Sequence, residues 1–195
     1  GYETLADIFR AINGSNTAPF VRVRSNDELD IRRALDIGAE GIIVPLVHTA
    51  EQAKKAVSYS KYPPAGIRGY AFCRANAWGD DFNEYVKSAN DNTMVFVMAE
   101  SREAVENINE ILDVDGIDGI FIGPYDMSAS YGVVGQPNHP LVTSGCETVL
   151  NACKAKGKIA GIHMVTPDEK AVRENIEKGF RFIAVGIDTL FLIKG

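Results

Sequence analysis

The sequence predicts an α/β fold built on parallel strands, and three observations support this class. Short apolar and β-branched runs alternate with amphipathic helical patterns almost throughout the 195 residues. Most runs are continuously apolar, which is typical of strands buried on both faces of a parallel sheet. Two helical patterns end in glycine just before a strand, at Gly38 and Gly179, as helix-to-strand joints commonly do. Two architectures remain open, a doubly wound sheet and an eight-stranded barrel.

The predicted strands are the runs in which β-branched and apolar residues dominate. In chain order they are Phe20–Arg24, Gly41–Pro45, Met94–Glu100, Gly119–Gly123, Ile159–Met164 and Phe182–Gly186. A barrel needs eight strands and typically about 250 residues, so a barrel would require further strands before Gly1. The open sheet lacks its best support, because no Gly-x-Gly-x-x-Gly motif follows a strand.

The predicted helices are stretches with apolar residues three or four positions apart. They are Tyr2–Asn13, Asp27–Ile37, Ala50–Ser60, Arg102–Leu112, Leu141–Lys156 and Asp168–Lys178. Ser25 and Asn26 are suitable caps for the second of these, and Pro167 precedes the last one as a start signal. The segment 70–92 is long and weakly patterned and contains the single tryptophan. We expect it to form a lid or an interface segment.

Composition and charge restrict the function classes. Twenty basic against 26 acidic residues give a net charge of −6, which argues against binding to nucleic acid or to an anionic membrane. No apolar run reaches the roughly 18 residues of a membrane helix, and the first residues lack the layout of a signal peptide. Cys73, Cys146 and Cys153 match no zinc pattern. We expect reduced thiols and a cytoplasmic location.

Two carboxylates follow neighbouring predicted strands and are the first candidates for chemistry. Glu100 ends one strand, and Asp126 comes just after the next. Adjacent strands lie about 4.8 Å apart, so the two groups can converge on one divalent cation. A ligand set made only of oxygens, with positions left for water and substrate, suits magnesium or manganese. The alternative is that each carboxylate caps the helix that follows it.

Arginines supply the second set of candidates. Arg22 lies inside an apolar strand and needs an anionic partner, either an enolate or carboxylate oxygen of a ligand or a salt bridge within the barrel. Arg24 shares the same strand face by parity, so periodicity does not choose between them. Arg68, in a loop stiffened by two prolines and two glycines, is expected to bind an anionic substrate or to hold the loop itself.

The three histidines have different expected roles. His163 ends a predicted strand, and a core or supporting role is favoured over one facing the site. His139, flanked by two prolines within three residues, is expected to fix a loop. His48 follows a strand end and is ambiguous. No Ser–His–Asp or Cys–His arrangement can be assembled from the spacing, and no Walker-type phosphate loop is present.

These motifs together resemble the HpcH/HpaI aldolase family, whose members include 4-hydroxy-2-oxoheptanedioate and 2-dehydro-3-deoxyglucarate aldolases. The resemblance covers essentially the whole chain. Its carriers are Phe20–Val23, Ala34–Ala39, Gly41–Pro45, Lys61–Gly69, Met98–Glu100, Phe121–Ser128 and Val185–Asp188. It implies a (β/α)8 TIM barrel forming one domain over residues 1–195, with the first two strands and the last helices absent from the chain. It also implies a homo-oligomer, commonly a hexamer built as a trimer of dimers.

The resemblance assigns roles to individual residues. Glu100 and Asp126 would hold a divalent ion, Mg²⁺ or Mn²⁺, with Co²⁺ also possible. Arg22 would stabilise the enolate, and Asp36 would raise the basicity of a catalytic histidine. The pyruvate subsite would comprise Arg22, Met98, Gly123, Pro124, Tyr125 and Asp126, with backbone N–H groups around Tyr125 and Asp126 meeting the substrate carboxylate.

Two positions depart from the family pattern. The catalytic histidine belongs to an Asp-x-Glu-His stretch that would immediately precede Gly1, so we expect residues upstream of the sequence. Met98 stands where relatives usually carry a glutamine near the substrate, which puts the substrate preference in doubt.

The function implied is that of a metal-dependent class II aldolase acting on 4-hydroxy-2-oxo acids. It would cleave or form the carbon–carbon bond between pyruvate, as its enolate, and an aldehyde. Two alternatives stay open: an idle or repurposed barrel that serves in binding or assembly, and a relative of the coenzyme-A-ester lyases. Enolate chemistry on pyruvate discriminates the first alternative from an aldolase.

Overall fold

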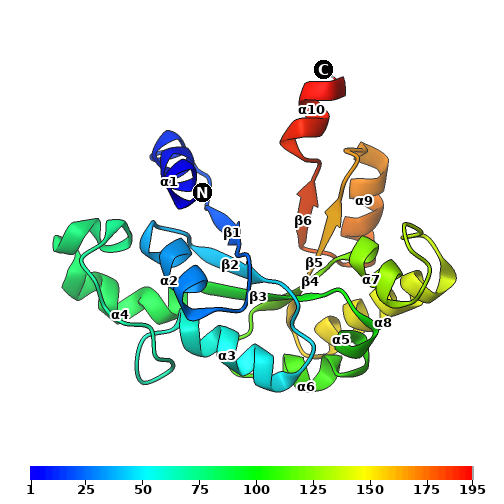
Figure 1. The fold of residues 1–195 in the computed structure, drawn as a ribbon, viewed down its shortest axis with the longest axis horizontal. Helices are drawn as coiled ribbons and strands as arrows, with labels where there is room; N and C mark the ends of the chain where they lie inside the picture. The colour runs from blue at the N-terminus through cyan, green and yellow to red at the C-terminus, as the bar shows by residue number, and fades with distance from the viewer. Residues whose placement is uncertain (195) are drawn as a thin grey trace.

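A computed structural model describes residues 1–194, and its centre is one six-stranded parallel sheet (Figure 1). The strands pair in chain order from β1 to β6. They are β1 (Phe20–Arg22), β2 (Gly41–Val44), β3 (Met94–Ala99), β4 (Gly119–Ile122), β5 (Ile159–Met164) and β6 (Phe182–Val185). All six predicted strands are therefore confirmed, with ends that differ by no more than two residues.

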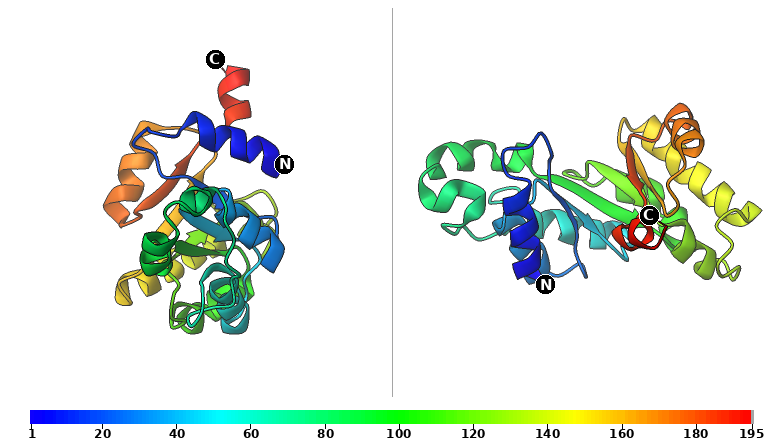
Figure 2. Two further views of the ribbon diagram at one scale, coloured as in Figure 1. Left: turned by 90° about the vertical axis from the view of Figure 1, so that its left-hand side faces the viewer. Right: turned by 90° about the horizontal axis from the view of Figure 1, so that it is seen from above.

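Helices between the strands cover the outer face of the sheet, whereas α10 projects away from it (Figures 1 and 2). The helices are α1 (Tyr2–Ala11), α2 (Glu28–Asp36), α3 (Ala50–Ser60), α4 (Phe82–Asn92), α5 (Arg102–Glu106), α6 (Ile108–Leu112), α7 (Pro124–Ser130), α8 (Pro140–Ala155), α9 (Glu169–Lys178) and α10 (Asp188–Lys194), with a 3₁₀ segment at Arg74–Gly79. The helix predicted over 102–112 is interrupted at Asn107 and forms α5 and α6 instead.

The sheet is curled, and each face packs into its own apolar core. Residues of odd and even parity separate cleanly, so that Ile42 and Val97 face the helices while Ile43 and Phe96 face the inside of the curl. Phe20 of β1 and Phe182 of β6 lie with ring centroids 5.1 Å apart, although their strands are the two edges of the sheet. The sheet is therefore a half-barrel. The eight strands of a complete barrel are not observed among residues 1–194.

Inside the curl, large and small residues are matched on neighbouring strands. Each pair consists of a phenylalanine and the glycine directly opposite it in register: Phe20 with Gly41, Phe96 with Gly119, and Phe121 with Gly161. A Cβ atom added at any of these glycines would collide with the paired ring. The glycines are thus sites where only hydrogen fits beneath an aromatic side chain.

The segment 61–92 lies at the amino ends of the strands. It begins where α3 ends and leads into β3 through α4, a helix that the sequence analysis missed. In parallel α/β folds the reactive edge is the opposite, carboxyl edge. The expectation that residues 70–92 form a lid is therefore wrong for this chain's own carboxyl edge, and the interface alternative stays a prediction.

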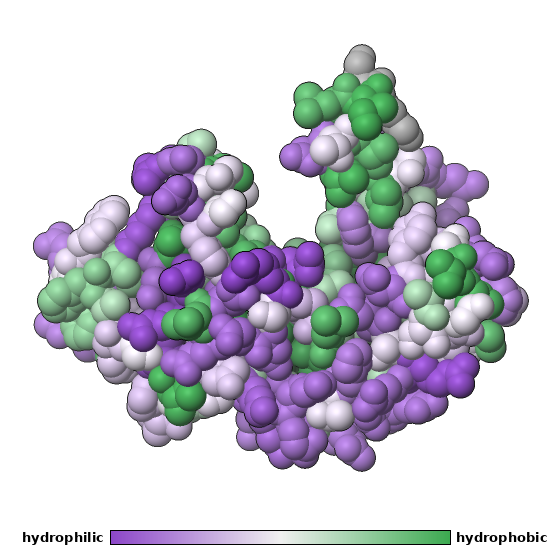
Figure 3. Space-filling model, in the orientation of Figure 1, coloured by the Kyte–Doolittle hydropathy of each residue, from purple (hydrophilic) through white to green (hydrophobic). Residues whose placement is uncertain are grey.

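The last helix carries apolar side chains into solvent. On α10, Phe191, Leu192 and Ile193 are 55%, 84% and 80% exposed. Figure 3 shows them as an apolar group at the projecting end of the molecule. No helix in the part of the chain that the structure describes is long and apolar enough to cross a membrane.

Candidate active site

One cavity of about 420 Å³ lies at the carboxyl ends of β1 to β5. Its walls are formed by Arg22, Arg24, Pro45, Leu46, Met98, Glu100, Phe121, Gly123, Pro124, Tyr125, Asp126 and His163. All predicted metal and substrate residues are in this set, so the structure brings them together. Asp36 is the one predicted site residue outside it.

Glu100 is a buried carboxylate with little support from the protein. Its side chain is 6% exposed, and Oε1 accepts one hydrogen bond, from the backbone N–H of Leu46 at 2.7 Å. Burial raises the pKa of Glu100, and the charge of Asp126 adds to this, while the Leu46 N–H and Arg22 act in the opposite direction. A carboxylate in such surroundings would be stabilised by a cation.

The Leu46 N–H reaches Glu100 because the backbone is strained at this residue. Leu46 has φ of +56°, in the left-handed region that leucine rarely adopts. Its side chain is 61% exposed, so packing of the leucine does not account for the conformation. Strain of this kind clusters at functional sites. Nothing in the sequence indicated it, because leucine is a poor residue for this conformation.

Gly123 leaves the space that the Glu100 carboxylate uses. A Cβ atom at residue 123 would lie 3.1 Å from Cβ and 3.2 Å from Oε2 of Glu100, and 3.4 Å from Cε of Met98. A larger residue would therefore push the carboxylate or the thioether aside. This is a packing reason for glycine at the end of β4.

Asp126 lies in the first turn of α7 and lines the same cavity as Glu100. Neither carboxylate is the cap of a helix: Ser101 caps α5 through its hydroxyl, and Gly123 occupies the N-cap of α7. Among residues 1–194 no group of three or more His, Cys, Asp and Glu side chains could hold a metal ion. Two carboxylates facing open space nevertheless fit Mg²⁺ or Mn²⁺, ions that commonly keep water or substrate as further ligands.

The structure separates the two arginines that periodicity left equivalent. Arg24 donates from Nη2 to Asp30 at 2.8 Å, and Asp30 also accepts from Tyr2 and Ser25. This network lowers the pKa of Asp30, the hydrogen bond from Arg24 being the largest cause. The Arg22 side chain enters no such pair among the described residues and helps to keep Glu100 ionised. Arg22 is therefore the guanidinium available to a ligand.

The histidines fall into three environments. His139 accepts at Nδ1 from the Leu141 N–H at the start of α8, which confirms its loop-fixing role. The Nδ1 atom of His48 lies 2.8 Å from the Ser101 hydroxyl, beside the cavity but not lining it. His163 lines the cavity, so the core role is wrong and the residue faces the site, while the supporting role that was favoured with it stays a prediction.

Asp36 lies at the other end of the fold. It is the last residue of α2, five residues before β2, and so sits at the amino edge of the sheet. Its carboxylate is 2.8 Å from Nη2 of Arg68. Asp36 therefore lies outside this chain's own cavity, and its predicted role beside a histidine upstream of Gly1 stays a prediction. The ion pair also decides the role of Arg68, which is 1% exposed and holds its own loop rather than a substrate.

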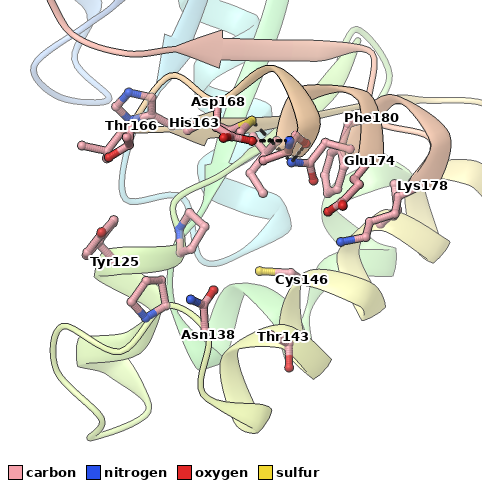
Figure 4. A pocket seen from close by; sticks show the side chains of 18 of the residues that line it. Tyr125, Asn138, Thr143, Cys146, His163, Thr166, Asp168, Glu174, Lys178 and Phe180 are labelled. Atoms are coloured by element: carbon pink, nitrogen blue, oxygen red, sulfur yellow. Dashed lines mark hydrogen bonds between the residues drawn. The ribbon is translucent and has the colours of Figure 1, made fainter.

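A second hollow of about 550 Å³ runs between α7, α8 and α9. Figure 4 shows Thr143 and Cys146 of α8 on one side and Glu174 and Lys178 of α9 on the other. Burial raises the pKa of the Cys146 thiol to about 11, so this cysteine is a weak nucleophile at neutral pH. The hollow meets the main cavity at Pro124, Tyr125 and His163.

Comparison with known proteins supplies the context for this site. The HpcH/HpaI aldolase/citrate lyase family model matches residues 2–195. A 4-hydroxy-2-oxo-heptane-1,7-dioate aldolase from Salmonella arizonae is 43% identical over 195 residues, 99% of this chain and 73% of that protein. A solved HpcH/HpaI aldolase/citrate lyase family protein from Burkholderia cenocepacia has a TM-score of 0.93 and 34% identity, over 100% of this chain and 77% of that one.

A more distant structure shares the fold alone. It is the protein CitE from Mycobacterium tuberculosis, 16% identical with a TM-score of 0.61, over 95% of this chain and 68% of that one. That protein was solved in complex with magnesium and acetoacetate.

Proposed function

The chain belongs to the HpcH/HpaI aldolase/citrate lyase family, a family of carbon–carbon lyases, and we propose that it is a metal-dependent aldolase for 4-hydroxy-2-oxo acids. It would cleave or form the bond between pyruvate, as its enolate, and an aldehyde. One observation carries the proposal: Glu100, Asp126 and Arg22 line a single cavity at the carboxyl edge of a parallel sheet.

Glu100 and Asp126 are the residues that would hold the metal. The fold neighbour solved with magnesium supports a divalent ion, for which we propose Mg²⁺ or Mn²⁺, with Co²⁺ possible. When bound, such an ion supplies Lewis-acid stabilisation of negative charge on a carbonyl oxygen. The burial of Glu100 keeps this charge in surroundings where electrostatic effects are strong.

The chain's own residues orient the 2-oxo acid. Arg22 would donate hydrogen bonds to the oxygen that becomes negative as the carbon–carbon bond breaks. The backbone N–H groups of Tyr125 and Asp126, next to Gly123 and Pro124, would meet the substrate carboxylate. Met98 would contact its apolar part in place of the amide that relatives carry. Among the described residues no lysine lines the cavity, so they offer no nucleophile for a Schiff-base mechanism.

The proposal is tested by proton exchange at the pyruvate methyl group. The full-length protein is incubated with Mn²⁺ and pyruvate in deuterated water, and the methyl protons are followed by NMR. We expect exchange in the wild type and its loss, by at least about 100-fold, in Glu100→Gln. A protein that binds the metal but leaves the methyl protons unexchanged would favour the idle or repurposed barrel.

We propose further that the half-barrel is part of a single TIM-barrel domain in a cytoplasmic homo-oligomer, a hexamer built as a trimer of dimers. The meeting of Phe20 and Phe182 across the curl supports the barrel. The exposed apolar residues of α10 support association with further copies. Light scattering on the full-length protein measures the oligomeric state.

A further inference from the structure

The residues that follow three adjacent strand positions form one layer that faces the cavity. The strand positions themselves, Ala99, Ile122 and Ile162, are in register across β3, β4 and β5 and face the helices on the other side. The next residues, Glu100, Gly123 and His163, therefore stand side by side and face the cavity. Since the middle position is glycine, no side chain separates Glu100 from His163.

The gap above Gly123 is the size of a small ligand. Strands two apart are separated by roughly 10 Å, so Glu100, which follows β3, and His163 of β5 lie on opposite sides of this gap. Asp126 and Arg22 act on the charge of Glu100. The oxo-acid half of a substrate belongs with the carboxylates and Arg22, which leaves the aldehyde half to His163.

A hydrogen bond fixes what His163 can offer. Its Nε2 atom lies 3.3 Å from the carbonyl oxygen of Gly186. A carbonyl only accepts, so Nε2 carries the proton and, in the neutral ring, Nδ1 is an acceptor. Nδ1 enters no hydrogen bond among the described residues. The neighbouring cavity walls are apolar, from Met98 and Phe121.

We propose that His163 is a specificity-determining residue that accepts a hydrogen bond from a hydroxyl group on the aldehyde half of the substrate. The proposal rests on the aldolase function proposed above. It predicts that the enzyme prefers a hydroxyaldehyde to the same aldehyde without the hydroxyl group. A site that hydrogen-bonds a substrate hydroxyl discriminates against the analogue lacking it, because a buried polar group is then left unpaired.

The test compares two aldehydes that differ by one hydroxyl, glycolaldehyde and acetaldehyde, as acceptors for pyruvate. The ratio of their kcat/KM values is measured in the full-length wild type, His163→Leu and His163→Asn. We expect the ratio to fall about 5- to 10-fold in His163→Leu and to change less than about 2-fold in His163→Asn, which keeps an acceptor. Taking a ratio within one variant cancels any general loss of folded protein. If His163→Leu does not fold, His163→Phe serves in its place.

Pyruvate methyl exchange, which needs no aldehyde, separates the two proposals. His139→Asn, at the α8 cap, is the matched control and should change neither quantity. Wild-type exchange with an unchanged aldehyde ratio in His163→Leu would overturn the role of His163 alone. Absence of exchange in the wild type would overturn both proposals.

Nitrogen-15 NMR of the imidazole should show the proton on Nε2, and the Nδ1–H tautomer would also overturn the role of His163.

Discussion

Each end of the sheet buries a charged side chain, but the partners of the two buried charges differ. At the amino edge, Arg68 is 1% exposed, pairs with Asp36 at 2.8 Å and lies 4.5 Å from the ring centroid of Tyr62. At the carboxyl edge, Glu100 is 6% exposed, accepts a single backbone hydrogen bond and has another carboxylate nearby.

The difference separates a structural charge from a functional one. Arg68 meets its counter-charge and an aromatic face within the protein, although its buried Nε atom has no hydrogen-bond partner among the described residues. Glu100 faces a cavity, and a single backbone hydrogen bond compensates its burial only in part, which is a condition that a bound cation would relieve. Burial alone does not identify an active site, and the partner of the buried group is the informative observation.

The largest expected effect of a substitution is at the amino edge. Arg68→Met leaves Asp36 with only its longer contact to Arg32, at 3.4 Å, and removes the guanidinium from Tyr62, so we expect the free energy of unfolding to fall by about 3–5 kcal/mol. Urea denaturation measures this change. Turnover of the remaining folded protein should stay within about 2-fold of the wild type. Arg10→Met, at an exposed pair with Asp7, is the control and should cost less than about 1 kcal/mol.

At the carboxyl edge the corresponding change is Asp126→Asn. A neutral ligand replaces a charged one, so we expect the affinity for Mn²⁺ to fall about 100-fold with little change in stability. Calorimetric titration measures the affinity, and Asp115→Asn, on an exposed loop, is the control. An unchanged affinity would remove Asp126 from the metal site.

The arginine assignment gives a smaller effect. Arg22→Lys replaces a planar fork with a point charge, and we expect turnover to fall about 30-fold while the metal still binds. Arg24→Lys should cost far less, because Arg24 is exposed and already paired with Asp30. Steady-state kinetics on both variants decide between them, and a larger loss in Arg24→Lys would reverse the assignment.

The smallest effect is expected at Leu46. Only its backbone N–H contacts Glu100, so Leu46→Gly should keep activity within about 2-fold and change the free energy of unfolding by less than about 1 kcal/mol. Leu46→Pro removes the N–H and cannot adopt a positive φ, and it should lose most activity. Equal activity in the two variants would show that this hydrogen bond has no role.

Much of the fold follows from the sequence because buried parallel strands have a strong signature. Every strand was predicted, and parity placed Arg22 and Arg24 on the same strand face. Helix α4 was missed, although Phe82, Tyr85, Val86 and Ala89 have helical spacing, because a turn-rich segment precedes it and no cap announces it.

From the sequence, the site could be predicted only where it is formed by side chains of a characteristic type. Glu100 and Asp126 are carboxylates next to strand ends, and the structure brings them to one cavity. The choice of Arg22 over Arg24 depends on Asp30, a contact across the β1–α2 joint that parity does not reveal. The hydrogen bond to Glu100 comes from the backbone N–H of Leu46, in a residue with a disfavoured φ angle. The type of residue at this position therefore does not indicate it. The position of Asp36 outside the cavity was not predictable, because a motif match does not specify at which edge of the sheet a residue lies.

The phenylalanine–glycine matches inside the curl have a consequence for how such sequences can diverge. The phenylalanine ring and the glycine opposite it belong to different strands, but the ring fills the space that a side chain at the glycine would need. Gain of a methyl group at Gly41 is compatible with folding only if Phe20 shrinks at the same time, whereas at Gly119 the backbone oxygen of Ile159 also stands in the way and a smaller residue at Phe96 does not suffice. Substitutions at Gly41 and Phe20 should therefore occur in compensating couples, and two individually harmful exchanges there should rescue each other when combined.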